Sequence, residues 1–256
     1  MRADCVTLWI GDSLGVIERA CLKSMVRQGH SVALYCYGTP AGVPAGVRVE
    51  DASAILPRSS FPPQWSNRSD LYSDWFRYVL QERDLGTWLD LDVYLVAPLE
   101  LESPYLFGEY EPGKINGAVL RLPPDAPVLD RLLRQFDGKS VPDAMPWRKR
   151  ISGELRRAIR GNYPLEHAPW GTTGPFALTR YVPQFGLSGY ARNSEVFYPA
   201  PWQKADWIAD PNVDLDQFVT NETIAVHLWN ELLKNFKHKP AAAGSFLARL
   251  QAEGGD

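Results

Sequence analysis

Residues 5–37 read CVTLWIGDSLGVIERACLKSMVRQGHSVALYCY, and this stretch predicts the fold. The compact apolar runs Cys5–Ile10 and Ser31–Tyr37 are typical of buried strands. Between them, apolar residues recur at helical spacing from Val16 to Met25. A strand, a helix and a second strand in this order form a right-handed β-α-β unit, so we expect the two strands to be parallel neighbours.

The chain that follows continues to alternate between strand and helix patterns. We expect strands at Val47–Glu50, Thr87–Leu89 and Ile115–Leu122, helices at Ser69–Arg83, Ala126–Phe136, Trp147–Arg160 and Thr173–Tyr181, and a short C-terminal helix. This alternation predicts an α/β fold with a Rossmann-like, mainly parallel sheet flanked by helices. We expect a single domain over residues 1–240 and a C-terminal helix and tail over residues 241–256.

Composition excludes several classes of protein. The 256 residues are 45% hydrophobic and 22% charged, which suffices for a full core. With 27 basic and 30 acidic residues, the formal net charge of −3 argues against a nucleic-acid-binding protein. No apolar run approaches the roughly 18–20 residues of a membrane span, and the first residues lack a secretory signal. Cys5, Cys21 and Cys36 form no CxxC pair, so we expect buried free thiols in the cytoplasm.

The stretch TWLDLDVYLV, residues 87–96, carries the strongest chemical signal. Asp90 and Asp92 leave the end of an apolar strand, where the ligand crevice of an open α/β sheet lies. Carboxylate oxygens suit Mg²⁺ or Mn²⁺, which bridge to substrate phosphates. An unpaired acidic pair in an apolar setting is costly unless something binds it. We therefore predict a divalent metal site at Asp90 and Asp92.

The preceding helix carries a polar stripe opposite its apolar face. Asp70, Asp74, Arg77 and Gln81 follow one another at i, i+4, i+7 and i+11. In one interpretation, Asp74 and Arg77 form an ordinary ion pair worth roughly a few tenths of a kcal/mol. In the other, both side chains hydrogen-bond a polyhydroxylated ligand beside the metal.

The same two aspartates are compatible with two other functions. A haloacid-dehalogenase-like phosphatase also carries a DXD after an apolar strand. That pattern has Thr or Val two residues after the second aspartate, where this chain has Tyr94, and it usually lies on the first strand. The second alternative is a non-catalytic, lectin-like module that only binds a sugar nucleotide.

Residues 73–99, SDWFRYVLQERDLGTWLDLDVYLVAPL, resemble the DXD region of the glycosyltransferases of family 32. That family contains initiation-specific mannosyltransferases and α-1,4-galactosyl and α-1,4-N-acetylglucosaminyl transferases. Further short motifs follow in the family's order: Trp9-Ile10-Gly11, Gly29-His30, Ile115-Asn116-Gly117-Ala118, Gly174-Pro175 with Thr179, and Ala225-Val226-His227-Leu228-Trp229-Asn230. One departure is Leu85-Gly86, where the family usually has Gly-Gly; it affects a turn and no ligand.

The resemblance implies a GT-A fold and a retaining hexosyltransferase. A sugar would pass from a UDP- or GDP-linked donor to a glycan or lipid-linked acceptor, with Mn²⁺ or Mg²⁺ between the diphosphate and the DXD. Asp90 and Asp92 would reach the ribose, the metal and the diphosphate, and His227 would be a further metal ligand. An imidazole in an otherwise all-oxygen shell favours Mn²⁺ over Mg²⁺. The alternative for His227 is a core histidine with one hydrogen bond.

The resemblance also implies roles for five residues around the donor. It places Trp9 at the nucleotide base and Trp229 near the diphosphate. Asp74 and Arg77 would hold hydroxyl groups of the donor sugar. Asn116 would touch the sugar or the acceptor, or would serve only in a turn.

The helix expected at Trp147–Arg160 is strongly basic. Its cationic side chains are Arg148, Lys149, Arg150, Arg156, Arg157 and Arg160. One interpretation is an ordinary surface helix; the other is contact with the anionic inner face of a membrane, where lipid-linked acceptors are built. The C-terminal amphipathic helix, with Phe246, Leu247 and Leu250, is a second candidate for that contact.

Overall fold

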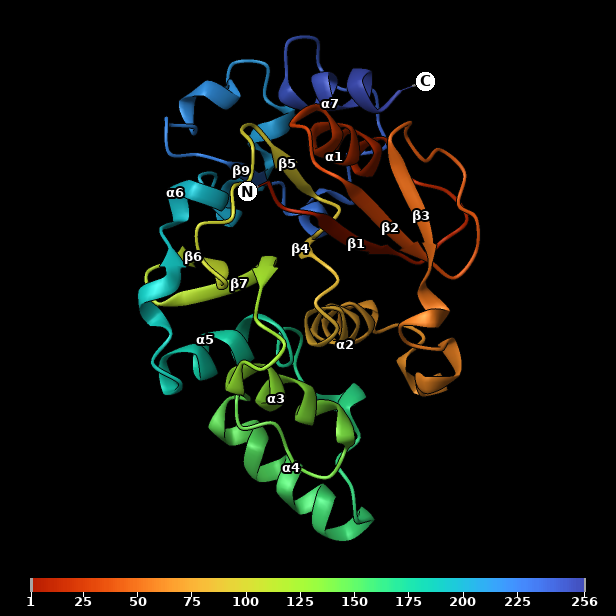
Figure 1. Ribbon diagram of the computed structural model, residues 1–256, viewed down its shortest axis with the longest axis vertical. Helices are drawn as coiled ribbons and strands as arrows, with labels where there is room; N and C mark the ends of the chain where they lie inside the picture. Colours follow the sequence, from red (N-terminus) through yellow and green to blue (C-terminus); the bar gives the residue numbers. More distant parts are fainter. Residues whose placement is uncertain (1, 256) are drawn as a thin grey trace.

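The computed structural model describes residues 2–255 and contains a seven-stranded sheet (Figure 1). The strand order is β3-β2-β1-β4-β7-β6-β8. These strands are β1 (Cys5–Trp9), β2 (Val32–Cys36), β3 (Val47–Asp51), β4 (Thr87–Leu89), β6 (Leu106–Glu111), β7 (Lys114–Arg121) and β8 (Ala191–Arg192). From β3 to β4 all neighbours are parallel, whereas β7 is antiparallel to both β4 and β6.

Helices flank the sheet, with α1 and α7 on one side and α2 on the other (Figure 1). The helices are α1 (Val16–Arg27), α2 (Ser69–Glu82), α3 (Pro127–Leu133), α4 (Trp147–Arg160), α5 (Pro175–Gln184), α6 (Ser194–Phe197) and α7 (Phe246–Gly254). Successive strand residues point to opposite faces. Leu34 therefore packs with Leu22 of α1, whereas its neighbour Tyr35 packs with Phe76 of α2. The expected α/β fold with a mainly parallel sheet flanked by helices is confirmed.

The opening β-α-β unit forms as expected. β1 and β2 pair in parallel, from Cys5 opposite Val32 to Trp9 opposite Cys36. The remaining helices lie within a few residues of their expected positions. The helix expected to begin at Thr173 begins instead at Pro175, the first residue of α5. Proline is favoured at this position because its fixed φ suits the first turn of a helix.

The pairings of β6 with β7 and β8, and of β5 with β9, were not expected. β6 and β7 form a hairpin whose two-residue turn is Pro112-Gly113, and Gly113 has φ +73°. A second sheet pairs β5 (Val93–Leu95) with β9 (Ala225–His227) in antiparallel fashion. The Pro-Gly dipeptide is a turn signal, but three-residue strands such as β5 and β9 are too short to show a period.

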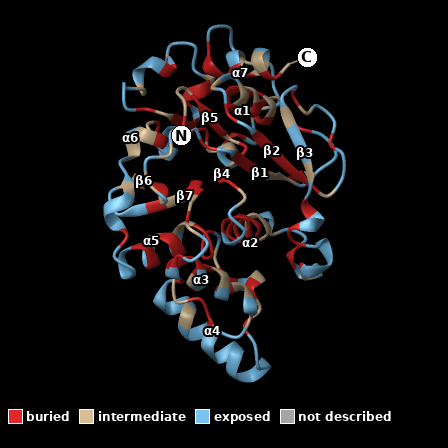
Figure 2. Cartoon of the chain, in the orientation of Figure 1, coloured by how far each residue is buried: buried red, intermediate tan, exposed pale blue. Residues whose placement is uncertain are grey.

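The C-terminal helix packs into the core, and the three cysteines are buried. Phe246, Leu247 and Leu250 of α7 belong to one apolar cluster with Ile17 and Cys21 of α1. The three cysteines are free and buried, as expected. Within residues 2–255, no helix combines the length and apolar character that a bilayer crossing requires. Figure 2 shows the buried residues concentrated in the sheet and its flanking helices, while α4 is exposed along most of its length.

Candidate metal centre

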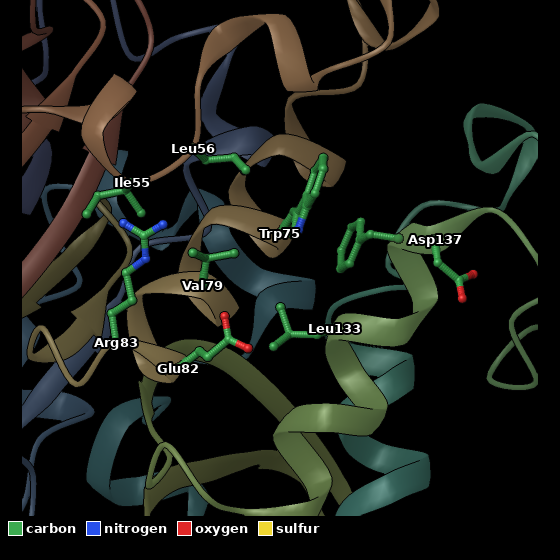
Figure 3. A pocket seen from close by; sticks show the side chains of 9 residues that line it. Ile55, Leu56, Trp75, Val79, Glu82, Arg83, Leu133 and Asp137 are labelled. Carbon is green, nitrogen blue, oxygen red and sulfur yellow. The ribbon is translucent and has the colours of Figure 1, made fainter.

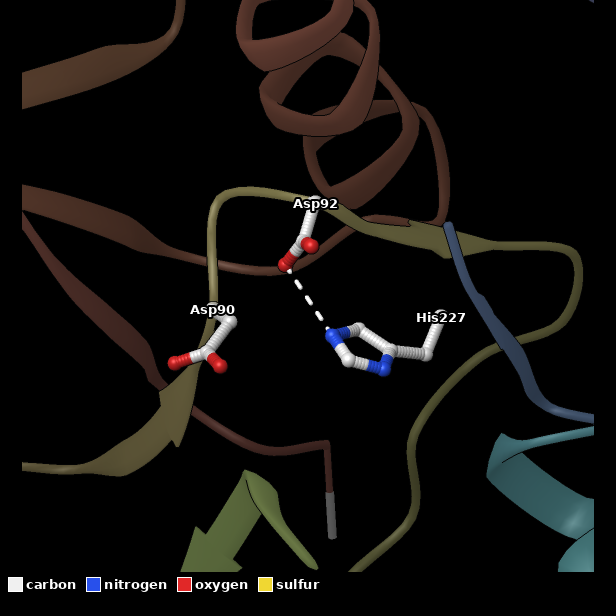
Figure 4. Close-up of side chains that lie close together, drawn as sticks. All are labelled: Asp90, Asp92 and His227. Carbon is white, nitrogen blue, oxygen red and sulfur yellow. Dashed lines mark ion pairs between the residues drawn. The ribbon is translucent and has the colours of Figure 1, made fainter. Parts of the chain in front are cut away.

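Asp90, Asp92 and His227 form a cluster beyond the end of β4 (Figure 4). Each residue offers one ligand atom, and these atoms lie within 4.8 Å of one another. The aspartates occupy the turn that joins β4 to β5, and His227 is the last residue of β9. The pairing of β5 with β9 sets Val93 opposite His227, and the Leu228 amide donates to the Asp92 carbonyl oxygen at 2.9 Å. The small second sheet therefore brings the histidine to the aspartates.

The two ring nitrogens of His227 have different surroundings. Nε2 lies 3.3 Å from Oδ1 of Asp92, whose other carboxylate oxygen accepts the Asn230 amide at 2.9 Å. Nδ1 is buried and has no hydrogen-bond partner among the described residues. Nε2 is therefore the nitrogen that faces the carboxylates, and it is the one placed to ligate a cation together with Asp90 and Asp92 (Figure 4). Two carboxylates and an imidazole are suitable donors for Mn²⁺.

Charges in the cluster act strongly on one another. Burial raises the pKa of Asp90, and the Arg77 charge only partly offsets this. Burial acts in the same direction on Asp92, but the His227 charge and hydrogen bonds from His227 and Asn230 lower its pKa overall. Burial would lower the pKa of His227, but Asp92 and then Asp90 raise it. A cation bound here would take the place of the histidine proton, because a ligating imidazole must be neutral.

Arg77 joins the cluster to the preceding helix. Its Nη2 lies 3.1 Å from Oδ1 of Asp90 and 3.5 Å from Oδ1 of Asp74. Nη1 donates to the Gly117 carbonyl oxygen at 2.7 Å, and the guanidinium lies 4.9 Å from the centre of the Trp88 ring. The expected pair of Asp74 with Arg77 is present, but the closer partner of Arg77 is Asp90. Arg77 thus holds one of the two aspartates in place.

Asp74 is buried against the loop that precedes α5. Thr173 donates its hydroxyl to Oδ2 of Asp74 at 2.7 Å. A Cβ atom on Gly174 would lie 2.7 and 2.8 Å from the two carboxylate oxygens, so only glycine allows this approach. Burial raises the pKa of Asp74 to about 6, against the effects of Arg77 and the Thr173 hydrogen bond. Thr173 was not singled out from the sequence, because no local pattern marks it.

The other members of the polar stripe have structural roles. Asp70 accepts two hydrogen bonds from Arg68, at 2.8 and 2.7 Å. The buried side chain of Gln81 donates to the Gly86 carbonyl oxygen and accepts the Leu122 amide. Of the four residues of the stripe, Arg77 contacts the cluster through Asp90, and Asp74 contacts Arg77.

Aromatic rings surround His227. The ring of Trp229 lies 4.2 Å from it and that of Tyr198 5.7 Å, centre to centre. Trp229 has φ +55°, a strained value for a residue with a Cβ, and its indole donates to the Ala200 carbonyl oxygen. Trp9 ends β1, the strand beside β4, and its buried indole nitrogen has no partner among the described residues. Tyr198 was not expected here.

Asn116 lies on β7, next to Gly117. Its side-chain oxygen accepts the Ala118 amide at 2.9 Å, and its carbonyl oxygen accepts the Tyr198 hydroxyl at 3.4 Å. These contacts give Asn116 a local structural role. Contact with a sugar or an acceptor remains a prediction.

A buried acidic residue of α1 holds the loop that follows His227. Glu18 accepts a hydrogen bond from the Asn230 side chain at 2.8 Å. Lys237 donates to the side-chain oxygen of Asn230 at 2.8 Å and lies 3.5 Å from Glu18. The backbone N–H of Asn230 donates to Asp92. Sequence inspection missed Glu18, because only the packing of α1 beside this loop brings it there.

A separate cavity of about 400 Å³ opens beside α2 (Figure 3). Its lining residues are Ile55, Leu56, Trp75, Val79, Glu82, Arg83, Leu133, Phe136 and Asp137. Trp75 and Val79 lie on a different face of α2 from Asp74 and Arg77. The cavity is therefore separate from the cluster.

Comparisons with known proteins find similar solved structures. No protein-family model matches the chain, and no curated protein matches it in sequence. A solved structure described as PaToxG glycosyltransferase is similar over 70% of this chain and 68% of that chain, with 12% identity and a TM-score of 0.40. At this distance, the chemistry of the site must be argued from the residues of this chain.

Proposed function

We propose that this protein is a metal-dependent, retaining glycosyltransferase of the type found in family 32. It would move a sugar from a UDP- or GDP-linked donor to a glycan or glycolipid acceptor in the cytoplasm. The observation that carries the proposal is the cluster of Asp90, Asp92 and His227 at the carboxyl end of β4. In open α/β sheets the ligand binds in the crevice beyond the carboxyl ends of the strands.

Asp90, Asp92 and His227 would hold Mn²⁺ or Mg²⁺. A bound divalent cation supplies positive charge to the diphosphate as it leaves with the bond electrons. The position of Nε2 of His227 supports this assignment, because it lies 3.3 Å from Asp92 and within the same cluster as Asp90. Arg77 keeps Asp90 oriented through its 3.1 Å contact.

The residues around the cluster would bind the donor. Trp9 would contact the nucleotide base, and Trp229 would lie beside the diphosphate. Asp74 would accept a hydrogen bond from a sugar hydroxyl, and Asn116 would contact the sugar or the acceptor. No side chain is assigned as a covalent nucleophile. The acceptor oxygen would attack from the face that the diphosphate leaves, and a departing phosphate oxygen would take its proton.

Donor hydrolysis by purified protein tests the proposal. UDP- and GDP-sugars are incubated with and without Mn²⁺, and the released sugar is measured. We expect Mn²⁺-dependent release, and Asp90→Asn and Asp92→Asn should fall below about a tenth of wild-type turnover. Asp130→Asn, at an exposed aspartate of α3, is the matched control.

Three outcomes would contradict the proposal. Turnover of Asp92→Asn above about a tenth of wild type at saturating Mn²⁺ would overturn the site assignment. Donor binding without hydrolysis or transfer would indicate a binding module. Release of phosphate from p-nitrophenyl phosphate, lost in Asp90→Asn, would indicate the phosphatase.

A further inference from the structure

Helix α4 exposes an unusually apolar face. Trp147, Ile151, Leu155 and Ile159 are 65, 63, 65 and 76% exposed. They follow one another at intervals of four residues, so they form one stripe along the helix. The helix has 14 residues and is therefore about 21 Å long. Large apolar side chains that stay this exposed in a continuous stripe indicate an interaction surface.

The opposite face of α4 attaches it to the rest of the protein. Gly153 is the buried residue of this helix. A Cβ atom there would lie 2.9 Å from Val141 and 3.1 Å from Tyr163, so glycine permits close contact. Residues 151 and 155 are each about 200° around the helix from residue 153. The contact at Gly153 therefore directs the apolar stripe outward.

Basic side chains occupy the half of the helix opposite the stripe. At 100° per residue, Lys149, Arg156 and Arg160 fall on one side of Gly153 and Arg150 and Arg157 on the other. With Arg148 the helix carries six basic residues, and Glu154 is its acidic residue, although the whole chain has a net charge of −3. Positive charge is thus concentrated on the polar half of a helix whose other half is the exposed apolar stripe.

We propose that α4 docks on an anionic membrane surface. The helix lies in the plane of the interface, with the stripe among the acyl chains and the long basic side chains of the polar half reaching the lipid phosphates. An outward apolar face, a tryptophan at its end and basic residues on its polar half are the features of interfacial helices. Six basic residues and one acidic residue give the helix a net positive charge, which an anionic lipid surface complements and a second copy of the same helix does not.

The structure also narrows the choice between the two helices expected to contact a membrane. In α7, Phe246, Leu247 and Leu250 are at most 4% exposed. They pack against α1 and have no free apolar surface to offer. α4 lies at the opposite end of the long axis from α7 (Figure 1). The docking surface is therefore α4 alone, and its binding needs neither donor nor metal.

Vesicle flotation tests this proposal without measuring catalysis. Protein is mixed with phosphatidylcholine vesicles containing or lacking about 30% phosphatidylglycerol, at low and high salt. We expect at least ~10-fold stronger partitioning to the anionic vesicles, lost at high salt. The double variant Ile151→Gln with Leu155→Gln should weaken this partitioning ~10-fold or more without lowering the melting temperature, since both side chains are exposed.

Separate variants test the contributions of the basic side chains and of the apolar stripe to membrane binding. Arg156→Gln with Arg157→Gln should weaken binding to anionic vesicles only. Val49→Gln, at an exposed apolar residue of the edge strand β3, is the matched control and should bind as wild type. Equal partitioning of wild type and the Ile151/Leu155 variant would overturn the proposal. So would sedimentation velocity that shows a dimer lost in that variant, because the stripe would then be a contact between copies.

Discussion

At the scale of single residues, His227 determines whether the cluster is a metal site or part of the core. One ring nitrogen faces Asp92 at 3.3 Å and the other has no partner among the described residues. Nε2 is the nitrogen that would ligate a cation beside both carboxylates, so replacing the imidazole distinguishes the ligand role from a packing role.

His227→Ala should raise the Mn²⁺ concentration for half-maximal activity by about ten-fold or more. This corresponds to a loss of at least ~1.4 kcal/mol of binding free energy. High Mn²⁺ should restore part of the activity, because Asp90 and Asp92 remain. The Mn²⁺ titration and the metal-free melting temperature are measured on the same variant. An unchanged Mn²⁺ midpoint with a melting temperature several degrees lower would show that His227 is a packed core residue and not a metal ligand.

Asp74 makes stability depend on pH. Its pKa rises from 3.8 to about 6 on burial, so the folded state holds this proton more tightly than the unfolded state. Its contribution to stability is therefore fully present below about pH 4 and is lost as the pH rises to about 6. The loss is about 3 kcal/mol.

Asp74→Asn should remove this loss, since asparagine does not ionise and can still accept the Thr173 hydrogen bond. The unfolding free energy of the variant relative to wild type should thus increase between pH 4 and pH 7. Urea unfolding in EDTA at both values measures the difference, with exposed Asp130→Asn as the control. A difference that does not change with pH would show that Asp74 is ionised equally in both states.

At the scale of elements, the contact between α2 and the start of α5 requires a residue without a side chain, Gly174. Gly174→Ala would place a Cβ within 2.8 Å of both Asp74 oxygens. We expect a loss of about 1–3 kcal/mol in unfolding free energy, as for other overpacked sites. Gly189→Ala is the matched control, because no atom lies within 4 Å of its added Cβ. Equal urea midpoints for the two variants would show that the loop before α5 shifts to accommodate the added methyl group without a loss of stability.

The link from α1 to the loop after β9 gives a second prediction at this scale. Glu18→Gln weakens the contacts with Asn230 and Lys237 without touching the cluster. These side-chain contacts hold Asn230, whose backbone N–H orients Asp92, so the Mn²⁺ midpoint should rise ~3-fold or more. Exposed Glu222→Gln is the control. A lower melting temperature with an unchanged Mn²⁺ midpoint would make this network structural only.

At the scale of the whole molecule, a bound cation would join β4 to β9, segments far apart in the chain. Mn²⁺ with a nucleoside diphosphate at 100 times its dissociation constant should add about 2.7 kcal/mol of stability. For a chain of this size, this is a rise of roughly 5–10 °C in melting temperature. Thermal unfolding of wild type and Asp92→Asn measures it. A shift of equal size in Asp92→Asn would place the binding site elsewhere.

The sequence by itself determined the features that depend on short spacings. The β-α-β opening, the two aspartates after β4 and the basic helix over Trp147–Arg160 all follow from local periodicity, which depends on neighbours within a few residues. The metal-ligand role of His227 came instead from a resemblance of motifs.

Only the tertiary structure decided the contacts between distant segments. The β5 and β9 pairing carries His227 to Asp92, and Arg77 lies closer to Asp90 than to Asp74, its neighbour on the same helix. Likewise, the helical pattern shows that α4 is amphipathic, but not which face is outward. The packing of Gly153 on Val141 decides that, because the burial of a face depends on what the rest of the chain places against it.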